Sequence, residues 1–145
     1  MCHANTEEVA KSIAGIGLGL DLTLRDIQDQ LKEKGDPWEC AKSFDGACPL
    51  TGFVSVSAVS LLDWQALELT LIKNGEVQQH GSSADMLFPI LPLIANMSEH
   101  FSLQPGDVIL TGTPAGVGPL DSGDSLSCEL SLRNRVLLTE NTMVL

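Results

Sequence analysis

The sequence predicts an α+β fold that is rich in strands, and its C-terminal half carries most of that prediction. Leucines alternate with other residues along 67–71, and apolar residues alternate along 126–132, which is the two-residue period of a strand with one buried face. Residues 89–102 predict a helix with two prolines near its first turn. Because hairpins join the strands, we expect an antiparallel or mixed sheet rather than a doubly wound parallel one.

A short helix is predicted near the start of the chain, at residues 5–13. Asn5 or Thr6 suits the N-cap, because a side-chain oxygen there accepts from an unpaired backbone N–H. Glu7 and Glu8 follow at the positive end of the helix dipole. The pattern therefore predicts a capped helix of two to three turns.

A buried strand is predicted next, at residues 14–22. Three glycines fall on one face of it, so another part of the chain must pack close to that backbone. Asp21 lies at the end of this strand. A second helix is predicted over 24–34, with Thr23 as its N-cap and Gly35 as its stop.

The remaining predicted strands follow a turn signal. Asn74-Gly75 is the preferred pair for a type I′ turn, so the alternating runs on either side of it predict a β-hairpin. Further strands are predicted at 108–112, 125–134 and 135–145, the last two forming a pair.

Length and composition restrict the class of protein. A chain of 145 residues predicts a single domain, 1–145. With 8 Lys+Arg against 19 Asp+Glu, the net charge of −11 argues against nucleic acid and against anionic membranes as partners. The four cysteines form no C-x-x-C, which indicates reduced thiols and a cytoplasmic protein. No apolar run approaches the roughly 20 residues of a membrane span, and the first residues lack the pattern of a signal peptide.

The stretch GDVILTGTPAGVG, residues 106–118, runs from the predicted strand at 108–112 into a glycine-rich loop. Its glycines are spaced G-x-x-x-G-x-G, which matches neither a dinucleotide fingerprint nor a P-loop. A tight connection whose glycines supply positive φ explains the spacing. It does not explain why Thr111 and Thr113 flank Gly112, so a ligand-binding role stays open.

Two further groups of polar residues are candidates for chemistry. Asp21, Arg25 and Gln28 meet at a strand-to-helix junction, where the arginine could clamp a carboxylate in bidentate fashion. The alternative, equally supported by the pattern, is that Asp21 caps the helix and Arg25 pairs with Asp29. Lys42 precedes a short loop, where it is either a partly buried cation or an ordinary surface lysine.

Three motifs resemble the fumarylacetoacetate hydrolase family in order and spacing: GLDLTLRDIQ, PWECAKSFDGACPL and LQPGDVILTGTPAGVG. The resemblance implies a mixed β-sandwich roll, usually a homodimer, that acts on small 2-keto or 1,3-dicarbonyl acids with Mg²⁺, or with Mn²⁺ or Ca²⁺. It implies a hydrolase or lyase that cleaves a C–C bond through a metal-stabilised enolate. A 2-hydroxymuconate-type isomerase or hydratase is the first alternative, and a non-catalytic assembly module is the second.

The same resemblance assigns roles to single residues. It implies that Asp21 is a metal ligand, that Lys42 is catalytic beside the metal, and that Thr113 meets a substrate carboxylate. Arg25 and Gln28 match positions near the substrate. Oxygen ligands of this kind are those that hard divalent cations prefer.

One departure from the family pattern concerns the metal. The resemblance implies a Glu-x-Glu pair upstream of the matched part, and no two acidic residues of this sequence lie two positions apart. We therefore expect the sequence to be the C-terminal portion of a catalytic domain that is incomplete at its N-terminus. The alternative is a natural short protein that has lost catalysis.

Overall fold

The computed structural model of the protein describes residues 1–59 and 62–145, which divide into two units. The larger unit consists of Met1–Leu18 and Gly52–Leu145 and contains the main sheet. The smaller unit is the intervening Gly19–Thr51 and contains two helices.

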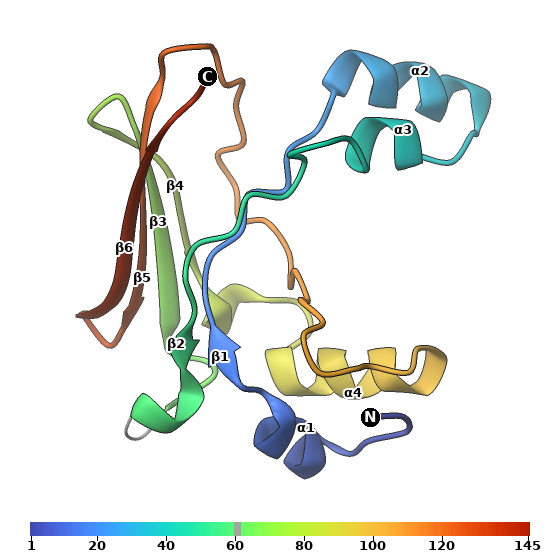
Figure 1. Ribbon diagram of the computed structural model, residues 1–145, viewed down its shortest axis with the longest axis vertical. Coiled ribbons are helices and arrows are strands. Elements are labelled where there is room, and N and C mark those ends of the chain that lie inside the picture. The colour runs from blue at the N-terminus through green and yellow to red at the C-terminus, as the bar shows by residue number, and fades with distance from the viewer. Residues whose placement is uncertain (60–61) are drawn as a thin grey trace. The chain divides into compact units, whose positions relative to one another are not determined.

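The main sheet of the larger unit is antiparallel throughout, with the strand order β4-β3-β5-β6 (Figure 1). Its strands are β3 (Leu67–Lys73), β4 (Glu76–Ser82), β5 (Ser125–Leu132) and β6 (Arg135–Met143). The two predicted strand pairs are therefore confirmed. The α+β fold is confirmed as well, because helices stand beside an antiparallel sheet within one chain.

The hairpin turn between β3 and β4 has the geometry that its sequence predicts. Asn74 and Gly75 both have positive φ, 52° and 85°, as a type I′ turn requires. The ladder then pairs Leu71 with Gln79 and Ile72 with Val77. Gln78 is consequently the extra residue of a β-bulge on β4.

Apolar side chains of β5 supply much of the core, because β5 lies between two other strands. Leu126, Cys128, Leu130 and Leu132 are all buried, with at most 8% of each exposed. Leu130 and Leu132 form one cluster with Val59 and Leu67. The predicted alternation along this strand is therefore confirmed, and it fixes which face of the sheet is buried.

Two helices of the larger unit pack together, α1 (Thr6–Ser12) and α4 (Ile90–His100). Asn5 caps α1 by accepting at its side-chain oxygen from the Glu8 N–H, and the Asn5 N–H in turn donates to Glu8 Oε2, completing a capping box. Val9 and Ser98 are fully buried in this region. Both helices begin near the residues that the sequence indicates.

The shorter elements are β1 (Gly15–Ile16), β2 (Val54–Ser55) and the 3₁₀ turns at Val56–Ala58 and Ser83–Asp85. β1 pairs with β2 in a two-residue ladder. The prediction of a continuous strand at 14–22 was wrong beyond Ile16. Alternating glycines weaken a strand. Beyond Ile16 the segment makes an isolated bridge between Gly19 and Leu50, and the N–H groups of Leu20 and Leu22 donate to the carbonyls of Pro49 (3.0 Å) and Ala47 (2.9 Å).

The strand predicted at 108–112 was also wrong. These residues form no ladder with any strand in the described part of the chain. Gly112 has φ of +126°, which a regular strand does not accept. The apolar run there is a connecting segment that leads into the glycine-rich loop.

The smaller unit contains α2 (Arg25–Lys34) and the one-turn helix α3 (Glu39–Lys42). Gly35 ends α2 as predicted. Thr23 is not the N-cap, because Leu24 occupies that position and Thr23 instead donates its hydroxyl to the Asp21 carbonyl, 3.3 Å away. Among all described residues, no helix is long and apolar enough to cross a membrane.

The core of the sheet generates a stability prediction. Leu130→Ala should lower the free energy of unfolding by about 2–5 kcal/mol, because it leaves a cavity beside buried neighbours. The matched control Leu87→Ala removes the same atoms from a side chain that is 88% exposed and should change stability by less than about 0.5 kcal/mol. Urea denaturation of both variants measures this, and equal losses would contradict the burial pattern.

Candidate functional site

An ion pair in the smaller unit joins two of the predicted site residues. The Lys42 Nζ lies 2.8 Å from Asp21 Oδ2. Lys42 is the last residue of α3, and the backbone bond from Leu24 N to Ala41 O (3.1 Å) ties α3 to the start of α2. The two side chains are 29% and 42% exposed, so the pair contributes at most about 1 kcal/mol to stability. The ion pair therefore adds little to stability, and its main effect is to hold the Lys42 ammonium in one position.

Arg25 and Gln28 form a second pair in the same unit. Arg25 Nη1 donates to Gln28 Oε1 at 3.1 Å, and Gln28 is 3% exposed while Arg25 is exposed. The alternative pairing of Arg25 with Asp29 is not what orients the guanidinium, and Lys32 is the cation that lies near Asp29, at 3.7 Å. A buried amide therefore holds an exposed guanidinium from one side.

The described residues do not fit a complete metal site. In residues 1–59 and 62–145, no group of three or more His, Cys, Asp or Glu side chains lies close enough to hold a metal ion. Asp21 offers one carboxylate, and one of its oxygens is already bonded to Lys42. A hard divalent cation needs more oxygen ligands than this, so the role of Asp21 as a ligand stays a prediction.

The glycine-rich loop lies against β4 in the larger unit. Gln78 Nε2 donates to the Gly116 carbonyl at 2.6 Å, and Gln79 Nε2 donates to the Pro114 carbonyl at 3.0 Å. Gly81 faces Pro114 so closely that a Cβ on Gly81 would lie 2.6 Å from the proline Cβ. The loop is therefore attached through its backbone to one strand.

Two glycines of the loop have different reasons to be glycine. Gly116 has φ of +94°, and a Cβ on it would overlap the carbonyl oxygen of Gln78. Gly112 has φ of +126° with open space around it, so its requirement is conformational alone. Thr113, between them, is exposed. The loop thus presents Thr113 at the surface while Gly116 packs against β4.

A cluster of polar contacts around Asp124, which we call the clamp, holds the end of the loop, and the sequence patterns did not indicate it. Lys73 Nζ donates to the Pro119 carbonyl (2.8 Å) and lies 2.7 Å from Asp124 Oδ2. The same carboxylate accepts from Asn74 Nδ2 and from the Asp121 N–H, both at 2.7 Å. These hydrogen bonds lower the pKa of Asp124 to about 2, with the largest contribution from the Asp121 N–H, followed by those from Lys73 and Asn74.

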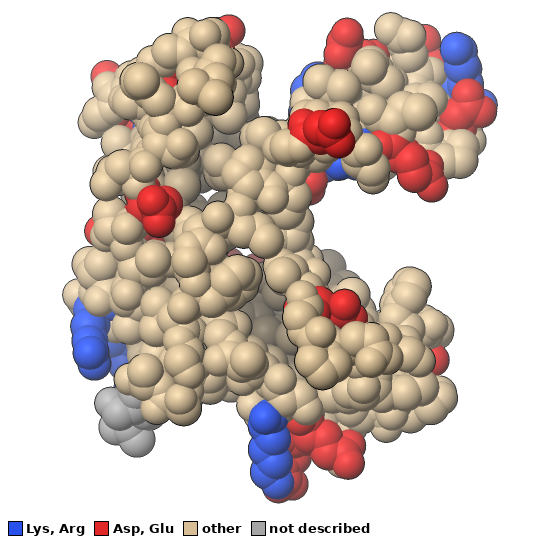
Figure 2. Space-filling view, viewed as in Figure 1, with Lys and Arg blue, Asp and Glu red and all other residues tan. Residues whose placement is uncertain are grey.

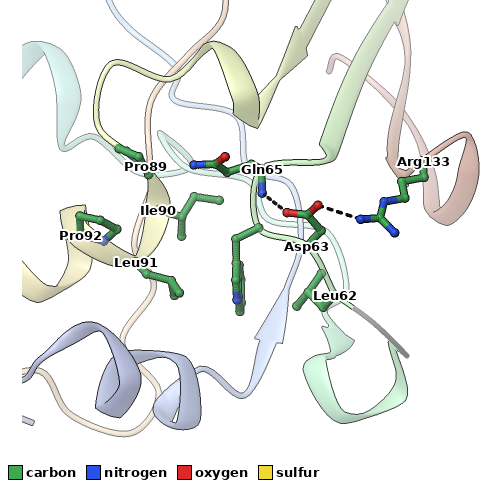
Figure 3. A pocket seen from close by; sticks show the side chains of 9 residues that line it. Leu62, Asp63, Gln65, Pro89, Ile90, Leu91, Pro92 and Arg133 are labelled. Carbon is green, nitrogen blue, oxygen red and sulfur yellow. Dashed lines mark hydrogen bonds and ion pairs between the residues drawn. The ribbon is translucent and has the colours of Figure 1, made fainter.

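An open hollow of about 610 Å³ lies elsewhere in the larger unit, beside α4 (Figure 3). It is lined by Leu62, Asp63, Trp64, Gln65, Pro89, Ile90, Leu91, Pro92 and Arg133. The Gln65 N–H and the Arg133 guanidinium, 2.9 Å away, both bind Asp63 and lower its pKa. The two charged side chains of the hollow, Asp63 and Arg133, are paired with each other. None of the lining residues is a predicted site residue, so we do not assign the function to this hollow.

The surface charge is mostly acidic, in line with the composition. Figure 2 shows the Lys and Arg side chains of the visible face as separate groups, with acidic residues more numerous. A small acidic substrate would therefore need local cations. In the smaller unit, Arg25 and Lys42 are such cations.

A sequence model described as "Fumarylacetoacetate (FAA) hydrolase C-terminal" matches residues 1–137. The chain is 53% identical over 138 residues to oxaloacetate tautomerase YcgM of Escherichia coli (strain K12), covering 93% of this chain and 63% of that protein. The chain thus spans less than two thirds of that relative's length.

Solved structures agree with this result. A putative fumarylacetoacetate isomerase/hydrolase from Oleispira antarctica is 74% identical, with a TM-score of 0.96 over 100% of this chain and 65% of that one. Fumarylpyruvate hydrolase from Pseudomonas aeruginosa, solved with Mn²⁺ and pyruvate, is 28% identical, with a TM-score of 0.88 over 99% of this chain and 59% of that one. The predicted roll-type fold is confirmed by these similarities.

The clamp on Asp124 generates a pH prediction. Because the folded pKa is about 2 against an ordinary 3.8, the carboxylate stabilises the fold above pH about 4, and this contribution is lost as pH falls toward 2. Between these values wild type should take up close to one more proton on unfolding than Asp124→Asn does. Urea midpoints at a series of pH values measure the difference, and identical pH dependences of the two proteins would refute the clamp.

Proposed function

Since the chain belongs to the fumarylacetoacetate hydrolase family, we propose that its protein is an enzyme of small 2-keto acids and that keto–enol tautomerisation of oxaloacetate is its reaction. The observation that carries the proposal is the 53% identity, over 93% of this chain, to a protein named oxaloacetate tautomerase. That reaction is an isomerisation, so it takes precedence over the C–C cleavage first expected from the motifs. We also propose that residues 1–145 are a single domain, the C-terminal portion of the catalytic domain.

Lys42 is the residue we assign to the developing charge. Tautomerisation moves a proton between the carbon beside the keto group and the keto oxygen, and negative charge gathers on that oxygen. An ammonium group carries three N–H donors, and Asp21 Oδ2 takes one of them. The remaining donors can stabilise the oxygen, while the ion pair holds the ammonium in place.

Arg25 and Thr113 are the residues we assign to carboxylates of the substrate. A guanidinium has five N–H donors, and Gln28 accepts one of those of Arg25, which leaves an edge of the fork for a carboxylate. Thr113 is exposed on the glycine-rich loop and can donate its hydroxyl. Arg25 belongs to the smaller unit and Thr113 to the larger one, and each assignment is argued from contacts within its own unit.

The proposal includes a divalent metal ion as cofactor, with Mg²⁺ as the first choice. It is supported by the related fumarylpyruvate hydrolase, which was solved with Mn²⁺. Asp21 is the ligand that this chain would offer. Because the described residues do not complete a site, the chemistry above is derived from the side chains alone. We further propose a homodimer in the cytoplasm, where the exposed thiols of Cys2, Cys40 and Cys48 would stay reduced.

Hydrolysis of an acylpyruvate is the second candidate function. It is favoured by the 28% identity to the fumarylpyruvate hydrolase. Both reactions place negative charge on the oxygen of an enolate, so the same cation suits either. The two differ in their products, because hydrolysis breaks a C–C bond and tautomerisation does not.

The test compares Lys42→Met with Lys34→Met in the intact protein. Removing the ammonium at 42 should lower kcat for the loss of enol-oxaloacetate absorbance by about 10²–10³-fold, the usual cost of removing one donor to a developing oxyanion. Lys34 ends α2 and is exposed, so its variant should stay within about twofold.

The same samples separate the candidate functions. Wild type that consumes enol-oxaloacetate without releasing pyruvate supports the tautomerase. Release of pyruvate from an acylpyruvate, with no acceleration of tautomerisation, would replace it by the hydrolase. Equal kcat values for the two lysine variants would remove Lys42 from the mechanism.

A further inference from the structure

The side chains of β4 determine where the glycine-rich loop lies, and we propose that Gln78 and Gln79 are positioning residues for Thr113. This inference rests on the proposed function, because it matters to activity only if Thr113 binds the substrate. It adds two residues that none of the sequence motifs indicated. All of the contacts that carry it lie within the larger unit.

The β-bulge makes two neighbouring glutamines available to one loop. In a regular strand, successive side chains point to opposite faces of the sheet, so Gln78 and Gln79 would diverge. The extra residue at Gln78 breaks that alternation. Both side-chain amides consequently reach carbonyls of the loop, at Gly116 and at Pro114.

The loop is also fitted to β4 by shape. Any side chain on Gly81 would meet the ring of Pro114, and any side chain on Gly116 would overlap the Gln78 carbonyl. These two approaches involve Pro114 and Gly116, the same two loop residues whose carbonyls accept the glutamine hydrogen bonds. The loop backbone therefore has little room to move relative to β4 between Pro114 and Gly116.

Thr113 is positioned through its neighbours in the chain. It is exposed, and it directly precedes Pro114, whose carbonyl accepts from Gln79 and whose ring abuts Gly81. At the far end of the loop, Lys73 holds the Pro119 carbonyl. A hydroxyl on a segment fixed in this way meets a ligand without first ordering the loop.

A purely structural alternative accounts for the same contacts. β4 is an edge strand of the sheet, and covering such an edge prevents unwanted pairing with other chains. The two roles differ in what they do to the enzyme: loss of a cover lowers stability, whereas loss of positioning weakens substrate binding. Binding and kinetics must therefore be read together with the mobility of the loop.

The experiment replaces a donor by an acceptor of the same shape. Gln79→Glu presents a carboxylate to the Pro114 carbonyl and should repel it, and Gly81→Ala should displace Pro114 by contact. The control is Gln30→Glu, the same chemical change at an exposed position of α2. In the intact protein, both test variants should raise KM for enol-oxaloacetate about three- to tenfold, the range for one net hydrogen bond. Their kcat should stay within about twofold of wild type.

Hydrogen exchange of the backbone amides in 110–119, followed by mass spectrometry, supplies the second readout. We expect about three- to tenfold faster exchange in the test variants and no change in the control. Unchanged exchange would overturn the inference, because the glutamine would not hold the loop. Faster exchange with an unchanged KM would also overturn it, in favour of the edge cover.

If the proposed function is wrong, the outcome differs from that of a wrong positioning role for the glutamines. A wild-type protein that turns over no enol-oxaloacetate would overturn that function and, with it, the role of loop position in binding. The exchange data would then still respond to Gln79→Glu and Gly81→Ala. The two failures are therefore told apart by whether the wild type is active.

Discussion

The register of β4 against β3 is the constraint on which the glycine-rich loop depends. The type I′ turn at Asn74-Gly75 begins the hairpin, and the bulge at Gln78 shifts the pairing by one residue. That shift decides which side chains of β4 reach the loop. The three glycines that look like a ligand-binding signature are in part the consequence of this backbone contact, since Gly116 lies against Gln78.

In the smaller unit, polar side chains are held by pairing with one another rather than by strand register. Two short helices are tied by the backbone bond from Leu24 to Ala41, and each polar pair has one member that fixes the other. Asp21 holds Lys42, and the buried Gln28 holds Arg25. Two cations are thus oriented in a chain whose net charge is −11, which is the local arrangement that an anionic substrate needs.

Local signals in the sequence predicted the regular elements well. The N-cap at Asn5, the Asn74-Gly75 turn and the alternation along β5 each depend on residues a few positions apart, and the structure confirms them. The strand expected at 14–22 formed only at Gly15–Ile16, and the one expected at 108–112 did not form, because an apolar run does not say how far a partner strand continues the ladder. Val108 and Leu110 are moreover 47% and 45% exposed, so an apolar run alone predicts neither a ladder nor burial.

The candidate site was predictable to a smaller extent. Pairing of Asp21 with Lys42 spans 21 positions, and pairing of Lys73 with Asp124 brings the last residue of β3 to the residue that precedes β5. No periodic pattern indicates such contacts, because they depend on how the strands and loops meet. Motif similarity identified candidate residues, whereas the hydrogen bonds from Gln78 and Gln79 to the loop depend on the folded arrangement of residues that lie 38 and 35 positions apart.

The central claim, that the loop is fixed against β4, is tested most directly by a nuclear Overhauser measurement on the labelled protein. Because a Cβ on Gly81 would lie 2.6 Å from the Pro114 Cβ, we expect a strong cross-peak between a Gly81 Hα and the Pro114 ring protons. Gly75, which has no such neighbour within 4 Å, is the control and should show no long-range cross-peak of this kind. Assigned resonances without the Gly81–Pro114 cross-peak would contradict the account.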